Sequence, residues 1–322
     1  MQNPPPSHKN PRLYLRNSLV AWGLALAVLV GALLSPSKPI TLAWLIPVLV
    51  LAYQVWKTYR TVHPSRLLAM GSQTPAALNL PYENVQFQSR DGLRLAGWYV
   101  PCPNSPTVIL VHGLGGSAGA MIYHAGVLLK RGYGSLLIDL RAHGSSQGNT
   151  CTYGIIEAND VLGAVDYLRS RPDVDASRIG ALGISLGAQA VLRAALLSVE
   201  IKGVILEGLG TTTLSDHGHP KPVWLWKLLY PYNWLLYRLG DWMCGVRPTE
   251  NTREALARLQ QPKLLISTGK GTEQRFGQIL FNLATEPKEL YEIPRASHAG
   301  GYFFAPKEYT EKIASFFDGA LM

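Results

Sequence analysis

From residue 84 onward, short apolar runs alternate with segments of helical periodicity. Strands are predicted at 85–88, 93–100, 107–112, 135–139, 179–184, 203–207, 263–267 and 289–293. The first two alternate apolar and polar residues around an Arg90-Asp91-Gly92 turn, which is typical of a hairpin. The run at 107–112 is continuously apolar, as expected for a strand buried on both faces. Helices are predicted at 117–131, 154–171, directly after 185, 273–284 and 306–317.

This alternation predicts an α/β fold with a mostly parallel sheet covered by helices on both faces. In such sheets the active site lies at the carboxyl ends of the strands. The polar residues of the chain that fall at these ends, or in the loops that follow them, are His112, Asp139, Ser185, Glu207, Glu273 and His298. We therefore expect the chemistry of the protein at this edge.

The amino-terminal part of the chain has a different pattern. Residues 1–16 are polar and proline-containing, which indicates a disordered tail. Two uncharged apolar runs follow, at 18–34 and 40–56, separated by a short Ser- and Pro-containing break. Each run is long enough for a helix of roughly 25 Å, near the lower limit for a bilayer. The pattern predicts a two-helix transmembrane hairpin over 17–57 and a connector over 58–82; a cleaved signal peptide and a buried helical pair are the alternatives.

The distribution of basic residues adds an orientation and an expected partner to this prediction. Basic residues flank both runs, so the positive-inside rule predicts a multi-pass membrane protein with two spans and a cytoplasmic catalytic domain. The net charge of +9 indicates an anionic partner. No run of basic residues interleaved with aromatic residues points to nucleic acid, so membrane lipid is the expected partner. The sequence does not indicate an oligomeric state.

Strand–helix alternation resumes only after an insertion at 211–262 within the predicted domain, which spans 83–322. This segment is rich in aromatic residues, namely Trp224, Trp226, Tyr230, Tyr232, Trp234, Tyr237 and Trp242. An insertion at the carboxyl edge of a sheet is typical of a helical lid over an active site. The aromatic side chains are expected to line an apolar pocket or touch a membrane interface, or else to form a small core of the lid itself.

The sequence Gly-x-Ser-x-Gly occurs three times, centred on Ser117, Ser146 and Ser185. Only at Ser185 do a predicted strand, a tight turn and a predicted helix follow one another in the sequence without a gap. Small residues such as Gly183 and Gly187 allow this strained turn, and the helix behind it directs backbone N–H groups at developing negative charge. Ser185 is therefore the candidate nucleophile, whereas Ser117 is interpreted as a helix N-cap.

A serine hydroxyl needs a base, and His298 is the best candidate because it lies in a small-residue loop between the last strand and the last helix. The backbone N–H groups of Leu114 and Leu186 are the candidate oxyanion-hole donors. The sequence leaves open which acid joins Ser185 and His298 as the third catalytic residue. Glu273 is the predicted acid, with Glu207 as the alternative and Asp216 after it.

The order of these features resembles the α/β-hydrolase superfamily. The stretch 139–146, which reads Asp-Leu-Arg-Ala-His-Gly-Ser-Ser, resembles a turn of its serine-aminopeptidase-like and lipase/esterase-like branches. The resemblance covers the chain from about residue 80 to the end. It implies an aspartate at the position that Thr272 occupies here, one residue before Glu273. It implies that His112, Asp139, Arg141 and His143 shape loops near the site, and that an acyl-enzyme forms on Ser185 and is hydrolysed by water that His298 activates.

A membrane-anchored serine hydrolase that cleaves a carboxylic ester is the predicted function, with a small, lipid-like acyl compound as the expected substrate. The alternatives are a serine peptidase of the same fold and a catalytically degenerate scaffold protein, since a fold alone does not fix an activity. The mechanism requires no metal or organic cofactor. The cysteines at 102, 151 and 244 are too few and too scattered for a zinc site or a disulfide framework.

Overall fold

A computed structural model of the protein describes residue 30 and residues 38–65, 73–217, 223–269 and 271–322. The predicted tail at 1–16 and nearly all of the first apolar run lie outside the described residues. The chain divides into two compact units. The smaller comprises residues 1–62 and 221–247, and the larger comprises residues 63–220 and 248–322.

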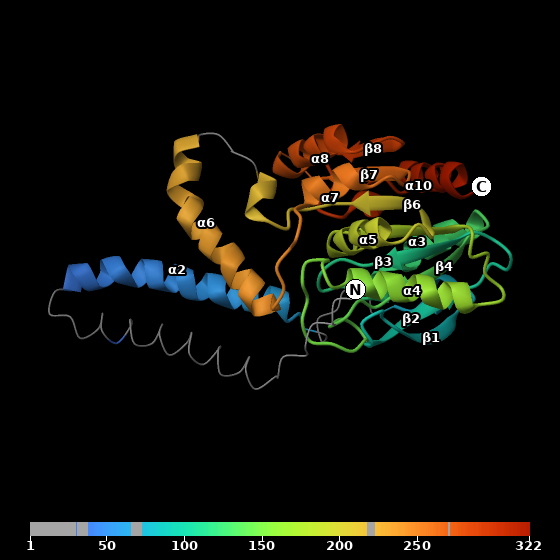
Figure 1. The fold of residues 1–322 in the computed structure, drawn as a ribbon, viewed down its shortest axis with the longest axis horizontal. Helices are drawn as coiled ribbons and strands as arrows, with labels where there is room; N and C mark the ends of the chain where they lie inside the picture. The colour runs from blue at the N-terminus through green and yellow to red at the C-terminus, as the bar shows by residue number, and fades with distance from the viewer. Residues whose placement is uncertain (1–29, 31–37, 66–72, 218–222, 270) are drawn as a thin grey trace, which may run out of the picture. The chain divides into compact units, whose positions relative to one another are not determined.

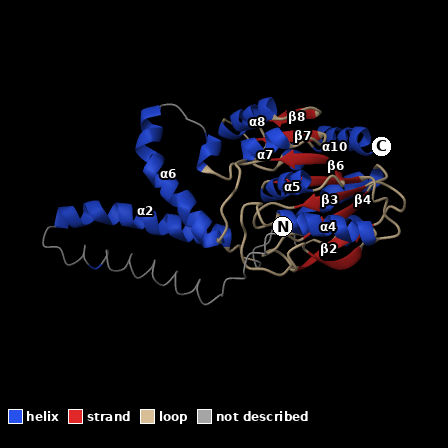
Figure 2. Ribbon diagram, in the orientation of Figure 1, coloured by secondary structure: helices blue, strands red, loops and turns tan. Residues whose placement is uncertain are grey.

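The larger unit is built on a sheet that contains eight strands among the described residues, in the order β1-β2-β4-β3-β5-β6-β7-β8. The strands are β1 (Glu83–Gln88), β2 (Arg94–Val100), β3 (Thr107–Val111), β4 (Gly134–Ile138), β5 (Ile179–Ile184), β6 (Ile201–Glu207), β7 (Lys263–Thr268) and β8 (Lys288–Ile293). The β1–β2 and β2–β4 pairs are antiparallel, and every later pair is parallel. The predicted mostly parallel sheet is confirmed (Figures 1 and 2).

Helices cover both faces of this sheet. The helices of the larger unit are α3 (Ile122–Lys130), α4 (Ala158–Ser170), α5 (Leu186–Leu197), α7 (Thr252–Arg258), α8 (Thr272–Leu283), α9 (Gly301–Phe304) and α10 (Pro306–Leu321), with 3₁₀ turns η2 (Pro75–Leu78), η3 (Ala118–Met121) and η4 (Leu214–His217). Helices α4, α5, α7 and α8 share one apolar core with one face of the sheet. Helices α3 and α10 form a second core with the other face (Figure 1).

The buried strands explain the two cores. Every residue of β3, β4 and β5 is buried, and successive side chains of a strand point to opposite faces. Ile109 accordingly joins the core with α5, whereas its neighbours Val108 and Leu110 join the core with α10. The continuous apolar runs seen in the sequence are therefore the central parallel strands.

The helix predicted at 117–131 differs from expectation at its start. It begins as the 3₁₀ turn η3, and the α-helix proper starts at Ile122. Ser117 lies at the N-cap position, but its side chain makes no capping hydrogen bond. Instead the carboxylate of Asp139 accepts a hydrogen bond from the N–H of Ala118 at 2.7 Å. A side chain that is distant in sequence therefore satisfies this helix terminus.

The smaller unit consists, in its described part, of α2 (Lys38–Val62) and α6 (Val223–Cys244), which pack against each other. The insertion at 211–262 is thus divided between the units. Its central helix α6 belongs with α2, while η4 and α7 belong to the larger unit. The aromatic side chains Tyr230, Trp234 and Trp242 of α6 are exposed by 40% or more. A role of this insertion as a lid stays a prediction.

The predicted transmembrane hairpin and the two-span membrane location are wrong. No helix in the described part of the chain has both the length and the apolar character needed to cross a bilayer. The second apolar run lies in α2, whose described side chains turn polar at Gln54 and basic at Lys57 and Arg60. An uncharged run of the length of 40–56, even with basic residues after it, is therefore not sufficient evidence of a membrane span.

Candidate active site

The turn between β5 and α5 holds Ser185 in a strained backbone conformation. Its φ and ψ angles are 54° and −110°, a region that side-chain-bearing residues rarely adopt. Crowding requires glycine on both sides, because a Cβ on Gly183 would lie 2.3 Å from the carbonyl oxygen of Gly187. A Cβ on Gly187 would lie 2.3 Å from the carbonyl oxygen of Val111. The sharp turn predicted from the sequence is therefore present at Ser185.

The loop after β8 brings His298 to this serine. The imidazole Nε2 of His298 lies 2.9 Å from the hydroxyl oxygen of Ser185, 113 residues away in sequence. The other ring nitrogen, Nδ1, lies 2.9 Å from a carboxylate oxygen of Glu273 at the start of α8. The three residues thus form one continuous hydrogen-bonded chain. Because Glu273 accepts a hydrogen bond from Nδ1–H, the neutral ring presents a free Nε2 lone pair to Ser185.

Thr268, the last residue of β7, is fully buried and supports the hydrogen bonds between Ser185, His298 and Glu273. Its hydroxyl donates a hydrogen bond to Glu273 at 2.9 Å and accepts one from the N–H of Ala299, also at 2.9 Å. One side chain therefore orients the carboxylate and the backbone next to His298. The sequence analysis did not identify Thr268. Its place at the carboxyl end of a parallel strand was the available signal.

The hydrogen bond with Glu273 raises the pKa of His298 above its usual 6.5. Partial burial of the ring opposes this effect, whereas the negative charges of Glu273 and Glu207 add to it. The side chain of His298 is 52% exposed, so solvent screens these charges in part. The imidazole is therefore a stronger base than an isolated histidine.

The loop after β3 faces the turn at Ser185 and is held by two histidines. A Cβ on Gly113 would lie 3.4 Å from the Cβ of Ser185, so the loop backbone runs directly against the serine. His112 donates from Nδ1 to the carbonyl of Gly113 at 2.7 Å, and the N–H of Gly115 donates to Nε2 of His143 at 3.1 Å. The N–H of Leu114 lies between these two anchored positions.

Burial keeps His112 neutral, lowering its pKa to about 3. The neighbouring ring of His143, 5.0 Å away between centroids, also disfavours a charge on His112. A neutral His112 can donate from Nδ1 and still accept, at Nε2, the hydrogen bond from the N–H of Leu140 at 3.1 Å. The loop beside Ser185 is thus fixed in part by a histidine that stays neutral.

The stretch 139–146 forms a tight loop after β4 that explains why the serine at 146 is not available for chemistry. The Ser146 hydroxyl is fully buried, donating to the carbonyl of Asp139 at 2.6 Å and accepting from the N–H of Ala96 at 2.9 Å. The Asp139 carboxylate accepts from the N–H groups of Ala118 and Ser145. Both residues therefore serve to connect loops, as the resemblance implied for Asp139.

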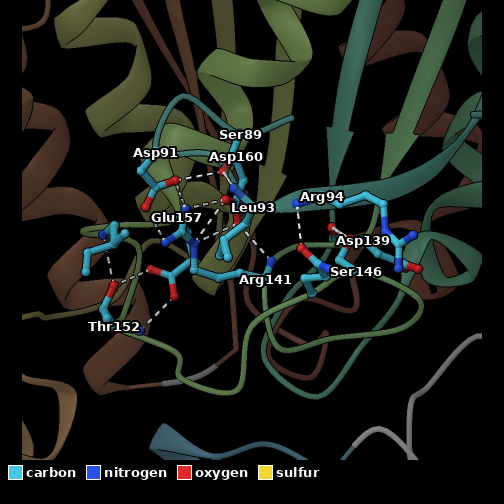
Figure 3. Close-up of polar contacts among 12 residues, drawn as sticks. Ser89, Asp91, Leu93, Arg94, Asp139, Arg141, Ser146, Thr152, Glu157 and Asp160 are labelled. Atoms are coloured by element: carbon cyan, nitrogen blue, oxygen red, sulfur yellow. Dashed lines mark hydrogen bonds and ion pairs between the residues drawn. The ribbon is translucent and has the colours of Figure 1, made fainter. Parts of the chain in front are cut away.

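Arg141 is the centre of the polar network beneath this loop (Figure 3). Its buried guanidinium contacts Asp160 of α4 at 2.6 Å and Asp91 of the β1–β2 turn at 2.7 Å. Burial alone would lower the pKa of Arg141, but the hydrogen bonds and charges of the two aspartates raise it overall. Arg141 consequently joins three segments that are far apart in sequence.

The alternative acids are not placed to orient His298. Glu207 is fully buried, and its carboxylate accepts hydrogen bonds from the N–H of Gly301 at 3.0 Å and the hydroxyl of Tyr309 at 2.6 Å. Asp216 accepts from the N–H groups of Thr212 and Thr213 within its own loop. Tyr309, which the sequence analysis did not identify, belongs to α10 and gave no motif signal.

No group of three or more His, Cys, Asp or Glu side chains in the described part of the chain is arranged to hold a metal ion. The polar groups that converge at the carboxyl edge of the sheet are instead a serine, an imidazole and a carboxylate. This arrangement can remove a proton from a hydroxyl and return it to a leaving group.

The fold and the geometry at its carboxyl edge are those of α/β hydrolases. A sequence profile described as the Alpha/beta hydrolase family matches residues 108–312, so the chain belongs to this family. The esterase Pf2001 of Pyrococcus furiosus is similar in structure, with a TM-score of 0.65 and 26% identity, over 82% of this chain and 100% of the esterase.

Relatives are also found by sequence. The alpha/beta hydrolase domain-containing protein WAV2 of Arabidopsis thaliana is 30% identical over 209 residues, which cover 60% of this chain and 63% of WAV2. The uncharacterized protein YfhR of Salmonella typhi is 36% identical over 118 residues, 35% of this chain and 40% of YfhR. In both cases the match spans less than two thirds of the relative. YfhR of Escherichia coli strain K12 is 26% identical over 74% of this chain and 81% of that protein.

Proposed function

We propose that the protein is a serine hydrolase that cleaves carboxylic esters through an acyl-enzyme on Ser185. The observation that carries this proposal is the chain from Ser185 to His298 to Glu273, with both contacts at 2.9 Å. A nucleophile, a base and a group that orients the base are the minimum for such a mechanism. The strained turn at Ser185 and the raised pKa of His298 support it.

In the first step the Ser185 hydroxyl oxygen bonds to the acyl carbon while its proton passes to Nε2 of His298. Glu273 stabilises the resulting imidazolium. The negative charge on the former carbonyl oxygen is assigned to the N–H groups of Leu114 and Leu186. Leu186 is the first residue of α5, so its N–H has no acceptor within the helix and lies at the positive end of the helix dipole.

The tetrahedral intermediate then collapses. The bond to the alcohol oxygen breaks, and the proton on His298 passes to that oxygen, which leaves an ester between the acyl group and Ser185. Water attacks this ester in the second half of the reaction, giving its proton to the neutral His298. Release of the carboxylic acid returns the proton to Ser185 and regenerates the enzyme.

An apolar acyl or alcohol group is the substrate chemistry that the surroundings favour. Helix α9 begins three residues after His298, and its Tyr302 stacks on Tyr123 of α3 with centroids 5.5 Å apart. Phe303 packs against both rings and is 69% exposed, while Phe304 is 50% exposed. The name of the similar Pyrococcus protein, an esterase, agrees with an ester as the scissile bond.

A fluorophosphonate probe tests the proposal directly, because it phosphonylates only a serine that a base activates. We expect the folded protein to be labelled, Ser185→Ala to lose labelling completely, and Ser145→Ala to be labelled like the wild type. Ser145 is an exposed serine within the second Gly-x-Ser-x-Gly stretch and is therefore a matched control. Folded wild-type protein that resists the probe would exclude the hydrolytic mechanism and favour the scaffold alternative.

A further inference from the structure

Glu207 makes two contacts that no other residue of the site combines. Its main-chain carbonyl accepts a hydrogen bond from the N–H of Ser185 at 2.8 Å. Its carboxylate oxygen Oε1 accepts from the N–H of Gly301, at the end of the loop that carries His298, at 3.0 Å. The nucleophile and the loop of the base are thus attached to the same residue at the end of β6.

The second carboxylate oxygen is also fully engaged. Oε2 accepts the hydrogen bond of the Tyr309 hydroxyl at 2.6 Å, and that hydroxyl lies 3.2 Å from Nε2 of His124. Burial lowers the pKa of His124 to about 4, so the ring is neutral and donates from Nε2 to the tyrosine oxygen. Burial raises the pKa of Glu207, and the hydrogen bonds from Tyr309 and Gly301 oppose that rise. Both carboxylate oxygens act as acceptors, which is the pattern of an ionised carboxylate.

The backbone that follows Glu207 lies against the imidazole of His298. Gly208 follows Glu207, and a Cβ on Gly208 would lie 2.9 Å from Cε1 of His298. The groups that face His298 are Ser185 from the turn before α5, Glu273 from α8 and Glu207 from β6. Glu273 contacts the ring directly, whereas Glu207 acts on it through charge and through the backbone of its loop.

We propose that Glu207 is a positioning residue for the reaction, which holds the loop of His298 against the turn of Ser185 and whose buried negative charge stabilises the imidazolium that forms on His298. This inference rests on the serine-hydrolase function proposed above. Glu207 is thus assigned a role different from that of the orienting acid, and the site contains two carboxylates with distinct tasks.

The test is the pH dependence of the rate constant for fluorophosphonate labelling, measured on the full chain. Labelling requires neutral His298, so the rate rises with pH through the pKa of His298. In Glu207→Gln we expect this rise to move to lower pH by about half a pH unit, because a nearby negative charge that favours the cation is removed. We also expect the rate at its plateau to fall about 3- to 10-fold, because Gly301 and Tyr309 are held less well.

Glu157→Gln is the matched control, since Glu157 is also fully buried and accepts hydrogen bonds from Thr152 and Gly154, but does not face His298. A purely structural effect of losing a buried carboxylate would appear in both variants and leave the pH of the rise unchanged. An unshifted rise in a folded, labelled Glu207→Gln variant would therefore overturn the inference while leaving the serine-hydrolase function intact. Absence of labelling in the wild type would overturn both.

Glu207→Asp separates the two effects and decides the question if Glu207→Gln does not fold. The aspartate keeps the charge but is one methylene shorter, so we expect the rise to stay at the wild-type pH and the plateau rate to fall at least threefold. A wild-type plateau rate in Glu207→Asp would show that the reach of this side chain does not position His298, and would overturn the inference.

Discussion

Glu273 stands one residue beyond the position at which the sequence comparison led us to expect an aspartate, and its side chain is one methylene longer. The longer side chain reaches Nδ1 of His298 at 2.9 Å from the first turn of α8. A carboxylate in the first turn of a helix is also stabilised by the helix dipole. The orienting group of the site is therefore displaced in sequence but retained in space.

We predict that Glu273→Gln lowers kcat by roughly 10²- to 10⁴-fold on any ester the enzyme hydrolyses. The amide neither stabilises the imidazolium nor selects the tautomer with a free Nε2 lone pair. Glu273 raises the pKa of His298, so its loss should also move the low-pH rise of kcat/KM to lower pH. The measurement is a pH profile of kcat and kcat/KM.

Glu292→Gln serves as the control, because Glu292 is an exposed carboxylate on the neighbouring strand β8. We expect it to retain the wild-type profile. A Glu273→Gln variant with kcat within threefold of the wild type would show that another group orients His298.

Single residues of the site were predictable to different degrees. Ser185 and His298 could be located because a tight turn and a small-residue loop mark them in the sequence. Thr268 was marked only by its place at the carboxyl end of a strand. Tyr309 could not be located, because its importance comes from a contact with a residue 102 positions away. Such contacts depend on strand order and on the packing of α10, neither of which leaves a local pattern.

At the scale of elements, the strands at the centre of the sheet were the most predictable, since burial on both faces requires continuous apolar runs. The start of α3 was less predictable than these strands, because Asp139 rather than Ser117 accepts the hydrogen bond of the first N–H of η3. The short helix α9 did not show in the sequence pattern. Its four residues, Gly301–Phe304, are too few for a periodicity.

Helix α9 nevertheless carries a prediction about the substrate. We expect the wild type to prefer octanoyl over acetyl p-nitrophenyl esters in kcat/KM, and Phe303→Ala to reduce this preference about 3- to 10-fold. Covering roughly 30–55 Å² of the exposed ring contributes about 0.75–1.4 kcal/mol at 25 cal/mol per Å². The measurement is kcat/KM over a series of acyl chain lengths.

Leu197→Ala is the control for this experiment. Leu197 is 66% exposed at the carboxyl end of α5, the opposite end of the helix from Ser185. Its removal should not change the order of preference. A wild-type enzyme that favours acetyl over octanoyl esters would contradict an apolar acyl substrate altogether.

The whole molecule shows where reasoning from composition fails. The absence of charge over 40–56 suggested a membrane span, yet in the described residues α2 pairs with α6 of the distant insertion to form a unit of its own. A run of apolar residues does not by itself identify the surface against which it lies. In the larger unit the apolar runs were interpreted correctly, because the alternation of strands and helices indicated that helices pack on both faces of a sheet.

The stability of the larger unit should depend strongly on Arg141. Its guanidinium holds the β1–β2 turn, the loop after β4 and helix α4 together through Asp91 and Asp160. Replacing it with methionine leaves Asp160 buried without a positive partner. We predict that Arg141→Met lowers the free energy of unfolding by roughly 3–5 kcal/mol, as measured by urea denaturation followed by circular dichroism.

The pH dependence of this loss distinguishes an uncompensated charge from lost packing. Burial raises the pKa of Asp160, and Arg141 opposes that rise in the wild type. Without Arg141 the folded-state pKa of Asp160 lies further above the pKa of the same residue in the unfolded chain. Between these two pKa values the folded protein binds more protons than the unfolded chain, so stability falls as pH increases. The destabilisation should therefore be larger at pH 8 than at pH 5.

Arg90→Ala, which breaks the exposed pair with Asp166, should cost less than about 1 kcal/mol at either pH. An equal loss for Arg141→Met at both pH values would instead assign its effect to packing.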